Sequence, residues 1–370
     1  MGTMWEQRKG LPLDESDDYA LVYGQPLVEA IARTGGAGAR IALTALAAVD
    51  DGELSVLARG LVDGLRRSES EPSWLPYVGE TTPTSAAVLR EDVFDDGFTV
   101  FLEARHATGD THAVGVYIDN NLGVMAKDTL LADSIDRVAE IMRHSASDGG
   151  ELRLEPLRPA DAAAEIRVAM ELTDMTLDPP VSEDYAALRA LAILRADEVP
   201  GIAAHQEHEE ITMAERDALR DEFLSAPEGR GFAADSDEAY AASLAIDFCA
   251  DYVDGRPLRW SPVVVELFMA HWVPGKVLAD EKLFAVLPVA LDAWVRFAGR
   301  KRSIPDWAIE ATREAIPRYR SEMTGAGNDP TSGGPAQQFL MAAQQAGIDL
   351  SDQEALGTFI AGWNARSTAT

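Results

Sequence analysis

Apolar residues along this chain follow two different spacings, and their order predicts the fold class. Between Leu27 and Leu65 they recur mostly every three to five residues, which indicates helices. Residues 98–126 are instead rich in Val, Phe, Tyr, Ile and Thr, which favour strands. After Pro159 almost every segment returns to the helical spacing. Strands confined to one block among helices predict an α+β protein that is predominantly α-helical.

The strand-forming block predicts a small antiparallel sheet, at about residues 98–126 and 151–157, flanked by helical subdomains. Gly109 lies in a hairpin connection between the first two strands. Pro72, Pro76 and Pro83 predict irregular structure up to about residue 86. We expect strands at about residues 98–105, 111–119, 122–126 and 151–157, and a helix at about 131–144 on one face of the sheet.

Changes in composition divide the chain into four predicted regions. These are a helical N-terminal region at 1–90, a small α+β unit at 91–158, a helical domain at 159–325, and a linker plus C-terminal helical hairpin at 326–370. The stretch 325–334 has the composition of a flexible linker. Thr212 followed by Glu215, and Ser351 followed by Glu354, are capping boxes that predict helix starts.

The charge of the chain is strongly negative and unevenly distributed. It has 32 Lys and Arg against 62 Asp and Glu, a formal net charge of −30, which excludes non-specific binding of nucleic acid or anionic lipid by the whole surface. Residues 251–320 depart from this background, because 11 Lys and Arg stand against 9 Asp and Glu there. That stretch, at +2, also holds four of the seven tryptophans.

The cysteine content and the apolar runs predict the compartment. Cys249 is the only cysteine, which excludes an internal disulfide, a CxxC redox motif and a zinc site built on two cysteines. The longest apolar run, residues 263–273, is far short of the roughly 18 to 20 residues that cross a bilayer. The first ten residues carry no apolar export signal. We therefore expect a soluble, cytoplasmic protein without membrane contact and without a cofactor.

Two polar clusters suggest catalytic or metal chemistry. His205 and His208 can share one face of a helix, with Glu209 as a third metal ligand or a base, although a solvated helix end before Thr212 explains them equally simply, and we favour it. The other cluster follows a predicted strand. It comprises Asp119 and Asn120, with His112 and Lys127 as further members of a site for acid–base chemistry or a small anion. A tight turn at 119–121 is the alternative, and we favour the turn.

A basic cluster in the tryptophan-rich stretch suggests a binding surface. It consists of Arg296, Arg300, Lys301 and Arg302, at the end of one predicted helix and the turn into the next. The arrangement resembles a basic helix–turn–helix corner. Cations also stabilise the C-terminus of a helix, and the same charges could instead dock on the acidic part of the chain itself.

Three segments resemble sequences of an uncharacterised family of actinobacterial hypothetical proteins. They are HAVGVYIDNNLGVMAKD at 112–128, RPLRWSPVVVELFMAHWVPGKVLADEKLFAVLPVALDAWVRFAGRKR at 256–302, and GIDLSDQEALGTFIAGWNAR at 347–366. The resemblance covers less than a third of the chain. It implies a bacterial, actinobacterial origin, and it carries over no activity and no functional residue.

The sequence favours a non-enzymatic binding or regulatory protein over an enzyme. We expect its Trp- and Arg-rich helices to contact a macromolecular partner, a protein first of all, with local nucleic-acid contact left open. A hydrolase that uses the sheet-edge cluster or a His-based metal site is one alternative. The other is a protein whose acidic surface mimics nucleic acid.

Overall fold

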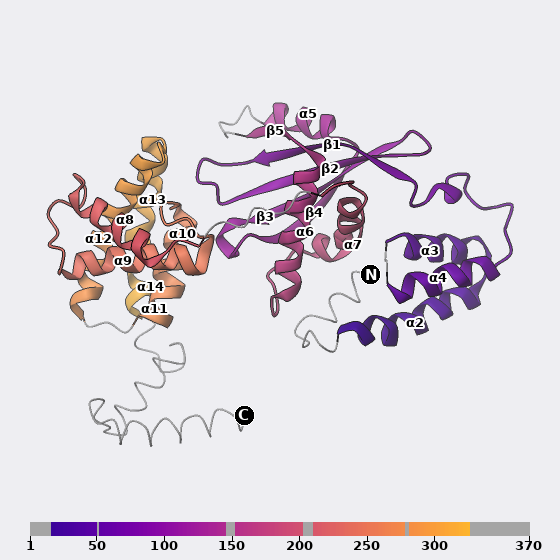
Figure 1. Cartoon of the computed structure of the whole chain (residues 1–370), viewed down its shortest axis with the longest axis horizontal. Helices are drawn as coiled ribbons and strands as arrows, with labels where there is room; N and C mark the ends of the chain where they lie inside the picture. The colour runs from indigo at the N-terminus through magenta and orange to yellow at the C-terminus, as the bar shows by residue number, and fades with distance from the viewer. Residues whose placement is uncertain (1–15, 50–51, 146–151, 203–209, 278–280, 326–370) are drawn as a thin grey trace, which may run out of the picture. The chain divides into compact units, whose positions relative to one another are not determined.

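A computed structural model describes residues 16–49, 52–145, 152–202, 210–277 and 281–325 of the chain. The chain forms two compact units, Met1–His208 and Glu209–Thr370 (Figure 1). The predicted α+β class is confirmed, because the described residues are predominantly helical and contain one five-stranded antiparallel sheet. Among the described helices, none has the length and apolar character needed to cross a bilayer.

The first unit begins with three helices, α2 (Ser16–Thr34), α3 (Gly36–Val49) and α4 (Glu53–Gly64). Their apolar stripes meet in a small core, formed by Val28, Leu43, Ala47, Leu54 and Ala58. Arg40 on α3 donates from Nη1 to the main-chain oxygens of Val62 and Leu65, at 2.8 and 3.0 Å. The Val62 carbonyl also accepts the Leu65 N–H at 3.1 Å, so Arg40 adds a second donor there and ties the end of α4 to α3.

The strands predicted at about 98–105, 111–119 and 151–157 are confirmed, and the strand at Thr81–Arg90 was missed. The strand predicted at 122–126 was misplaced, because Asn120–Leu122 forms a 3-10 turn and the strand runs from Met125 to Ala132. The strands of the sheet are β1 (Thr81–Arg90), β2 (Gly97–His106), β3 (Thr111–Asp119), β4 (Met125–Ala132) and β5 (Arg153–Leu157), in the order β4-β3-β2-β1-β5. The prediction of irregular structure up to residue 86 was wrong, because β1 begins at Thr81. The register shifts between Pro83 and Ser85, and such a bulge accommodates a proline that has no N–H to donate.

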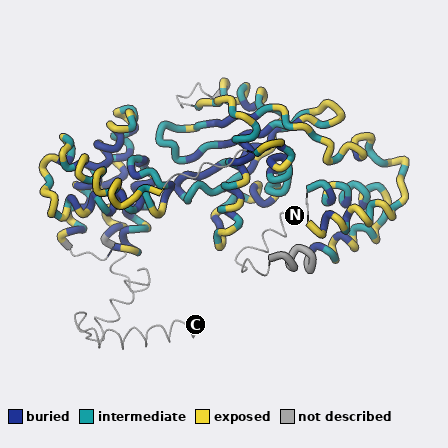
Figure 2. The backbone as a smooth tube through the Cα atoms, in the orientation of Figure 1, coloured by how far each residue is buried: buried dark blue, intermediate teal, exposed yellow. Residues whose placement is uncertain are grey.

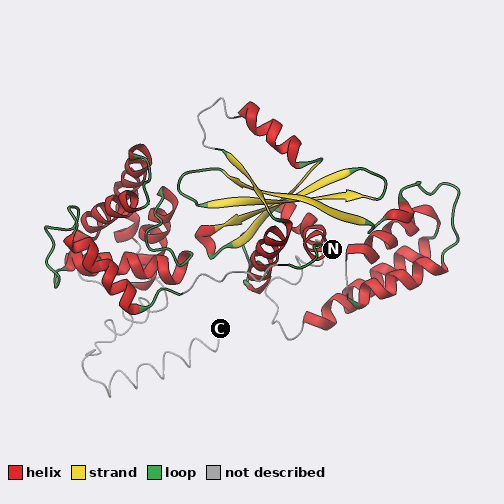
Figure 3. Ribbon diagram, turned by 45° about the horizontal axis from the view of Figure 1, so that its top comes forward, coloured by secondary structure: helices red, strands yellow, loops and turns green. Residues whose placement is uncertain are grey.

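Helices cover both faces of this sheet (Figure 3). One face packs on α6 (Pro159–Met175) and α7 (Glu183–Asp197), and the other packs on α5 (Ile135–Ser145). The predicted helical domain at 159–325 includes residues of α6 and α7, which in the structure pack on the sheet. Buried alanines along α6 allow that helix to lie close to the strands.

The second unit is helical around one large core, whose buried residues appear dark in Figure 2. Its helices are α8 (Met213–Ser225), α9 (Asp237–Phe248), α10 (Pro262–Glu266), α11 (Val273–Lys276), α12 (Glu281–Lys301), α13 (Asp306–Arg318) and α14 (Arg320–Gly325). The capping box predicted at Thr212 is confirmed. Oγ1 of Thr212 accepts from the Glu215 N–H at 3.3 Å, and the main-chain N–H of Thr212 donates to Glu215 Oε2 at 2.8 Å. The second predicted capping box and the C-terminal hairpin lie outside the described residues.

Gly115 allows two large side chains to meet on the α5 face of the sheet. A Cβ atom at this position would lie 2.7 Å from Cε1 of Phe101 and 2.9 Å from Cγ of Leu130. We expect Gly115→Val to destabilise the first unit by about 1–3 kcal/mol, because overpacking forces neighbouring side chains out of their preferred rotamers. Thermal unfolding measures the effect. Gly38→Ala in α3 is the control, since its added methyl meets nothing within 4 Å, and an equal loss there would contradict the argument.

Candidate functional site

The four residues of the predicted sheet-edge cluster lie in two places. Asp119 ends β3, Asn120 follows it, and Lys127 lies on the neighbouring strand β4. His112 is at the opposite end of β3, and seven residues of extended chain separate it from Asp119 by roughly 23 Å. These residues therefore belong to two separate polar groups, which we describe in turn.

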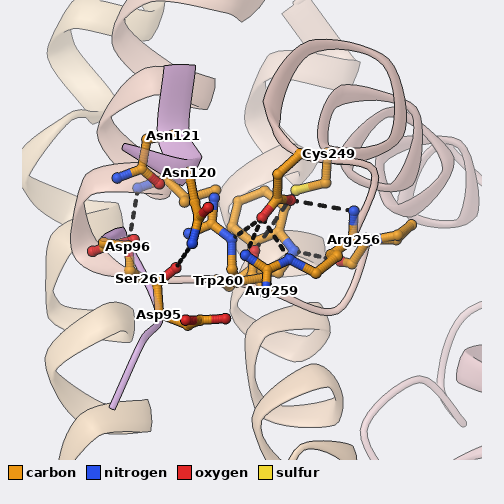
Figure 4. A network of polar contacts seen from close by, with 12 residues as sticks. Asp95, Asp96, Asn120, Asn121, Cys249, Arg256, Arg259, Trp260 and Ser261 are labelled. Atoms are coloured by element: carbon orange, nitrogen blue, oxygen red, sulfur yellow. Dashed lines mark hydrogen bonds and ion pairs between the residues drawn. The ribbon is translucent and has the colours of Figure 1, made fainter. Parts of the chain in front are cut away.

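The Asp119 group closes the turn at the end of β3. Asp119 accepts the N–H of Asn121 at 2.8 Å through Oδ1, and its Oδ2 lies 3.1 Å from Nζ of Lys127. Asn120 donates from its main-chain N–H to the Asp96 carbonyl at 2.9 Å and from Nδ2 to the Asp95 carbonyl at 2.8 Å (Figure 4). The structure thus shows the turn that the sequence analysis offered as the alternative, and Asp119 is its N-cap.

The surroundings of this turn are acidic. Burial, followed by the nearby carboxylates of Asp119, Glu91 and others, raises the pKa of Tyr117 well above its usual range. Burial, together with Asp92, also raises the pKa of Glu91. An anion arriving here would have to compete with Asp119 for Lys127. The geometry therefore favours a structural role for Lys127 over the predicted binding of a small anion, and acid–base chemistry here stays a prediction.

The His112 group is a connected network that the sequence analysis recognised only in part. Nδ1 of His112 lies 2.9 Å from Nε2 of His106 on β2, and Nε2 of His112 accepts from Nε of Arg195 on α7 at 2.8 Å. Arg195 is only 5% exposed, and its Nη1 also donates to both carboxylate oxygens of Glu198, each at 2.8 Å, and to the Thr81 hydroxyl at 3.0 Å. Burial, then the Arg195 cation and then His106 lower the pKa of His112 to about 4.

Part of this network could have been found from the sequence. His106 and His112 flank the predicted hairpin turn, and His112 pairs with Ala104, two residues before His106 on β2, so both histidine side chains lie on the same face of the sheet. Arg195 and Glu198 lie 83 or more residues further along the chain. Local sequence patterns carry no signal for such a contact, because it depends on how α7 packs on the sheet.

The predicted basic cluster is engaged with carboxylates of its own unit. Arg300 forms a bidentate pair with Glu228, at 2.7 and 3.0 Å, and Nζ of Lys301 lies 2.6 Å from Oε1 of Glu222. The hydrogen bond from Arg300 is the main reason why the pKa of Glu228 is lowered. Arg296 pairs with Asp292 on its own helix, and the main-chain N–H of Arg302 donates to Ala298. The intramolecular docking considered in the sequence analysis is thus present for Arg300 and Lys301.

Two π-helical turns bring aromatic side chains together in the second unit. The turns are Cys249–Val253, after α9, and Leu267–Trp272, between α10 and α11. Tyr252 from the first meets Trp272 from the second edge-on, with ring centroids 5.6 Å apart, and Nζ of Lys276 lies 5.8 Å from the Tyr252 ring. We call Tyr252, Trp272 and Lys276 the aromatic patch. Tyr252 is half exposed, and Phe268 stacks behind Trp272.

Buried polar contacts fix the chain between these two turns. Oδ2 of Asp254 lies 2.5 Å from Nε of the buried Arg259 and 2.6 Å from Nε of Arg256. The thiol of Cys249 contacts the Arg259 carbonyl at 3.8 Å, and burial raises the pKa of this thiol far above its usual range (Figure 4). Ser261 caps α10 by accepting the Val264 N–H at 3.1 Å. The position of the aromatic patch is therefore set by a rigid support.

Neither the candidate metal ligands nor the comparisons with known proteins identify a further site. The predicted metal ligands His205, His208 and Glu209 lie outside the described residues. Within the described ranges, no three His, Cys, Asp or Glu side chains are grouped so that they could hold a metal ion. Comparisons with protein-family models, curated proteins and solved structures gave no match. The actinobacterial resemblance therefore stays a prediction.

The Asp119 cap and the Asp119–Lys127 ion pair make different contributions to stability. We expect Asp119→Ala to cost about 1–2 kcal/mol of unfolding free energy, because it leaves the buried N–H of Asn121 without its acceptor. Lys127→Met removes only a partly exposed ion pair and should cost less than about 1 kcal/mol. Urea unfolding compares the two variants. A larger loss for Lys127→Met would show that the ion pair, not the cap, holds the turn.

Proposed function

We propose that this chain is a non-enzymatic binding protein whose second unit contacts a partner protein through the aromatic patch. The observation that carries the proposal is the meeting of two π-helical turns at Tyr252 and Trp272. π-Helical turns are rare and are frequently found at functional sites. Two of them at one surface indicate that the placement of these side chains matters more than helix stability.

The chemistry of the patch suits a protein surface. Tyrosine and tryptophan dominate the energetics of protein–protein interfaces, because they present a large rigid area at low entropic cost. The indole N–H of Trp272 is covered and has no hydrogen-bond acceptor among the described residues. Native structures keep few such groups. Lys276 adds one positive charge at the edge of the patch, which favours a partner segment that carries a carboxylate.

The basic cluster supports this proposal less well than the aromatic patch does. A partner that bound Arg300 or Lys301 would first have to displace Glu228 or Glu222. Phosphate groups of nucleic acid would compete with the same carboxylates. Local nucleic-acid contact, the hydrolase alternative and the acidic mimic of nucleic acid stay predictions from the sequence.

The experiment compares two half-exposed tyrosines of the same unit. Tyr252 lies in the patch at 50% exposure, and Tyr240 lies on α9 at 54% exposure. A photo-reactive amino acid is placed at each position in the full chain, and covalent partners from the native host are identified by mass spectrometry. The affinity of the purified partner is then measured by calorimetry. We expect Tyr252→Ala to weaken binding at least tenfold, about 1.4 kcal/mol, and Tyr240→Ala to leave it unchanged.

Two results would overturn the proposal. One is a set of crosslinks that is the same from both positions, which would show contact by random collision. The other is an equal loss of affinity in both variants. Circular dichroism and thermal unfolding of both variants exclude the trivial case in which one tyrosine variant has lost its fold.

A further inference from the structure

We infer that His106, His112 and Arg195 form a proton-sensitive clasp, which holds the end of α7 against the β2–β3 hairpin only while both imidazoles are neutral. The clasp lies in the first unit and is independent of the aromatic patch. The inference rests on which ring nitrogens can donate and which must accept.

The arginine fixes the tautomer of the first histidine. A guanidinium group only donates, so Nε2 of His112, which receives the Arg195 Nε–H at 2.8 Å, must carry a lone pair. In a neutral imidazole the proton then resides on Nδ1. That Nδ1–H points at Nε2 of His106, 2.9 Å away, so the His106 nitrogen must also be an acceptor. The bonds thus run in one direction, from Arg195 through His112 to His106.

A proton on either ring breaks this chain of bonds. On Nε2 of His112 it would face the N–H of Arg195, and on Nε2 of His106 it would face the Nδ1–H of His112. Each case replaces a hydrogen bond by two opposed donors. A charge on His112 would also lie beside the buried Arg195 cation, in a partly buried site.

The other charged and polar groups at the clasp are already engaged. Glu198, which directly follows α7, accepts from Nη1 of Arg195 through both carboxylate oxygens, and from β1 the hydroxyl of Thr81 donates to Glu198 Oε2 at 2.5 Å. From β2, the facing titratable group is His106 itself. Glu198 therefore offsets the charge of Arg195, and Arg195, not a carboxylate, contacts Nε2 of His112. Protonation would release the β3 side of the clasp and leave Arg195 with Glu198 and Thr81.

The sign of the pH effect follows from His112. Its pKa is about 4 in the folded chain and about 6.5 when unfolded, so the unfolded chain binds more protons between these values. Stability is therefore fully present above pH 6.5 and falls as the pH drops towards 4. One proton taken up on unfolding raises the unfolding equilibrium constant by up to tenfold per pH unit in this window.

The first test measures urea unfolding of the full chain between pH 7.5 and pH 4.5. We expect His106→Gln with His112→Gln to flatten the profile by up to about tenfold per pH unit, because glutamine can accept from Arg195 but does not titrate. His271→Gln, at an exposed histidine of the second unit, is the control and should keep the wild-type slope. An unchanged slope in the double variant would overturn the clasp.

The second test needs no variant and covers the case in which the double variant does not fold. Nitrogen-15 spectra of the wild-type imidazoles at pH 7.5 report which ring nitrogen carries the proton. We expect Nδ1–H on both His106 and His112, and loss of amide protection in the β2–β3 hairpin when either ring is protonated. An Nε2–H form of His112 at pH 7.5, or hairpin protection that is unaffected by its protonation, would contradict the inference.

Discussion

Burial on both sides of the three interior strands, β1, β2 and β3, is the constraint on which the first unit depends. Residues 99–102 of β2 and 113–116 of β3 are buried without interruption, although neighbouring side chains of a strand point to opposite faces. Other elements must therefore cover both faces of a sheet that contains such strands. The chain supplies the covers from its next segments, α5 for one face and α6 with α7 for the other. The edge strands β4 and β5 are more exposed and do not share this requirement.

The same constraint determines which polar groups meet. α7 must lie on the sheet to cover Val114 and Val116, and this position carries Arg195 to the hairpin end of β3. The Asp119 turn and its neighbouring carboxylates lie at the opposite end of β3. A strand is stiff over its length, so residues that are near in sequence, such as His112 and Asp119, cannot converge on one site. The polar networks of this unit are therefore consequences of how the apolar faces are closed.

Much of the fold could be predicted from the sequence, because the decisive signals are local. The change from helical to strand-like spacing predicted the α+β class, and the capping box at Thr212 predicted the start of α8. β1 was missed because Pro83 counts against a strand unless a bulge accommodates it, and a bulge depends on the partner strand. The contacts within the candidate sites were harder to predict from the sequence. Sequence could place His106 beside His112, but the ion pairs of Arg300 and the partners of Arg195 depend on packing between segments far apart in the chain.

The ion pairs of Arg300 and Lys301 change how the positively charged residues of the second unit are interpreted. The basic stretch 251–320 suggested a surface for an external partner, yet Arg300 and Lys301 hold the acidic α8 and the turn that follows it. Paired charges of this kind contribute to specificity of packing more than to binding, since a ligand must first break them. Tyr252 of the aromatic patch remains half exposed, while Trp272 packs against Phe248 and Phe268 of the core. Arg300 and Lys301 therefore hold helices of this unit together, and contact of the aromatic patch with a partner stays a proposal.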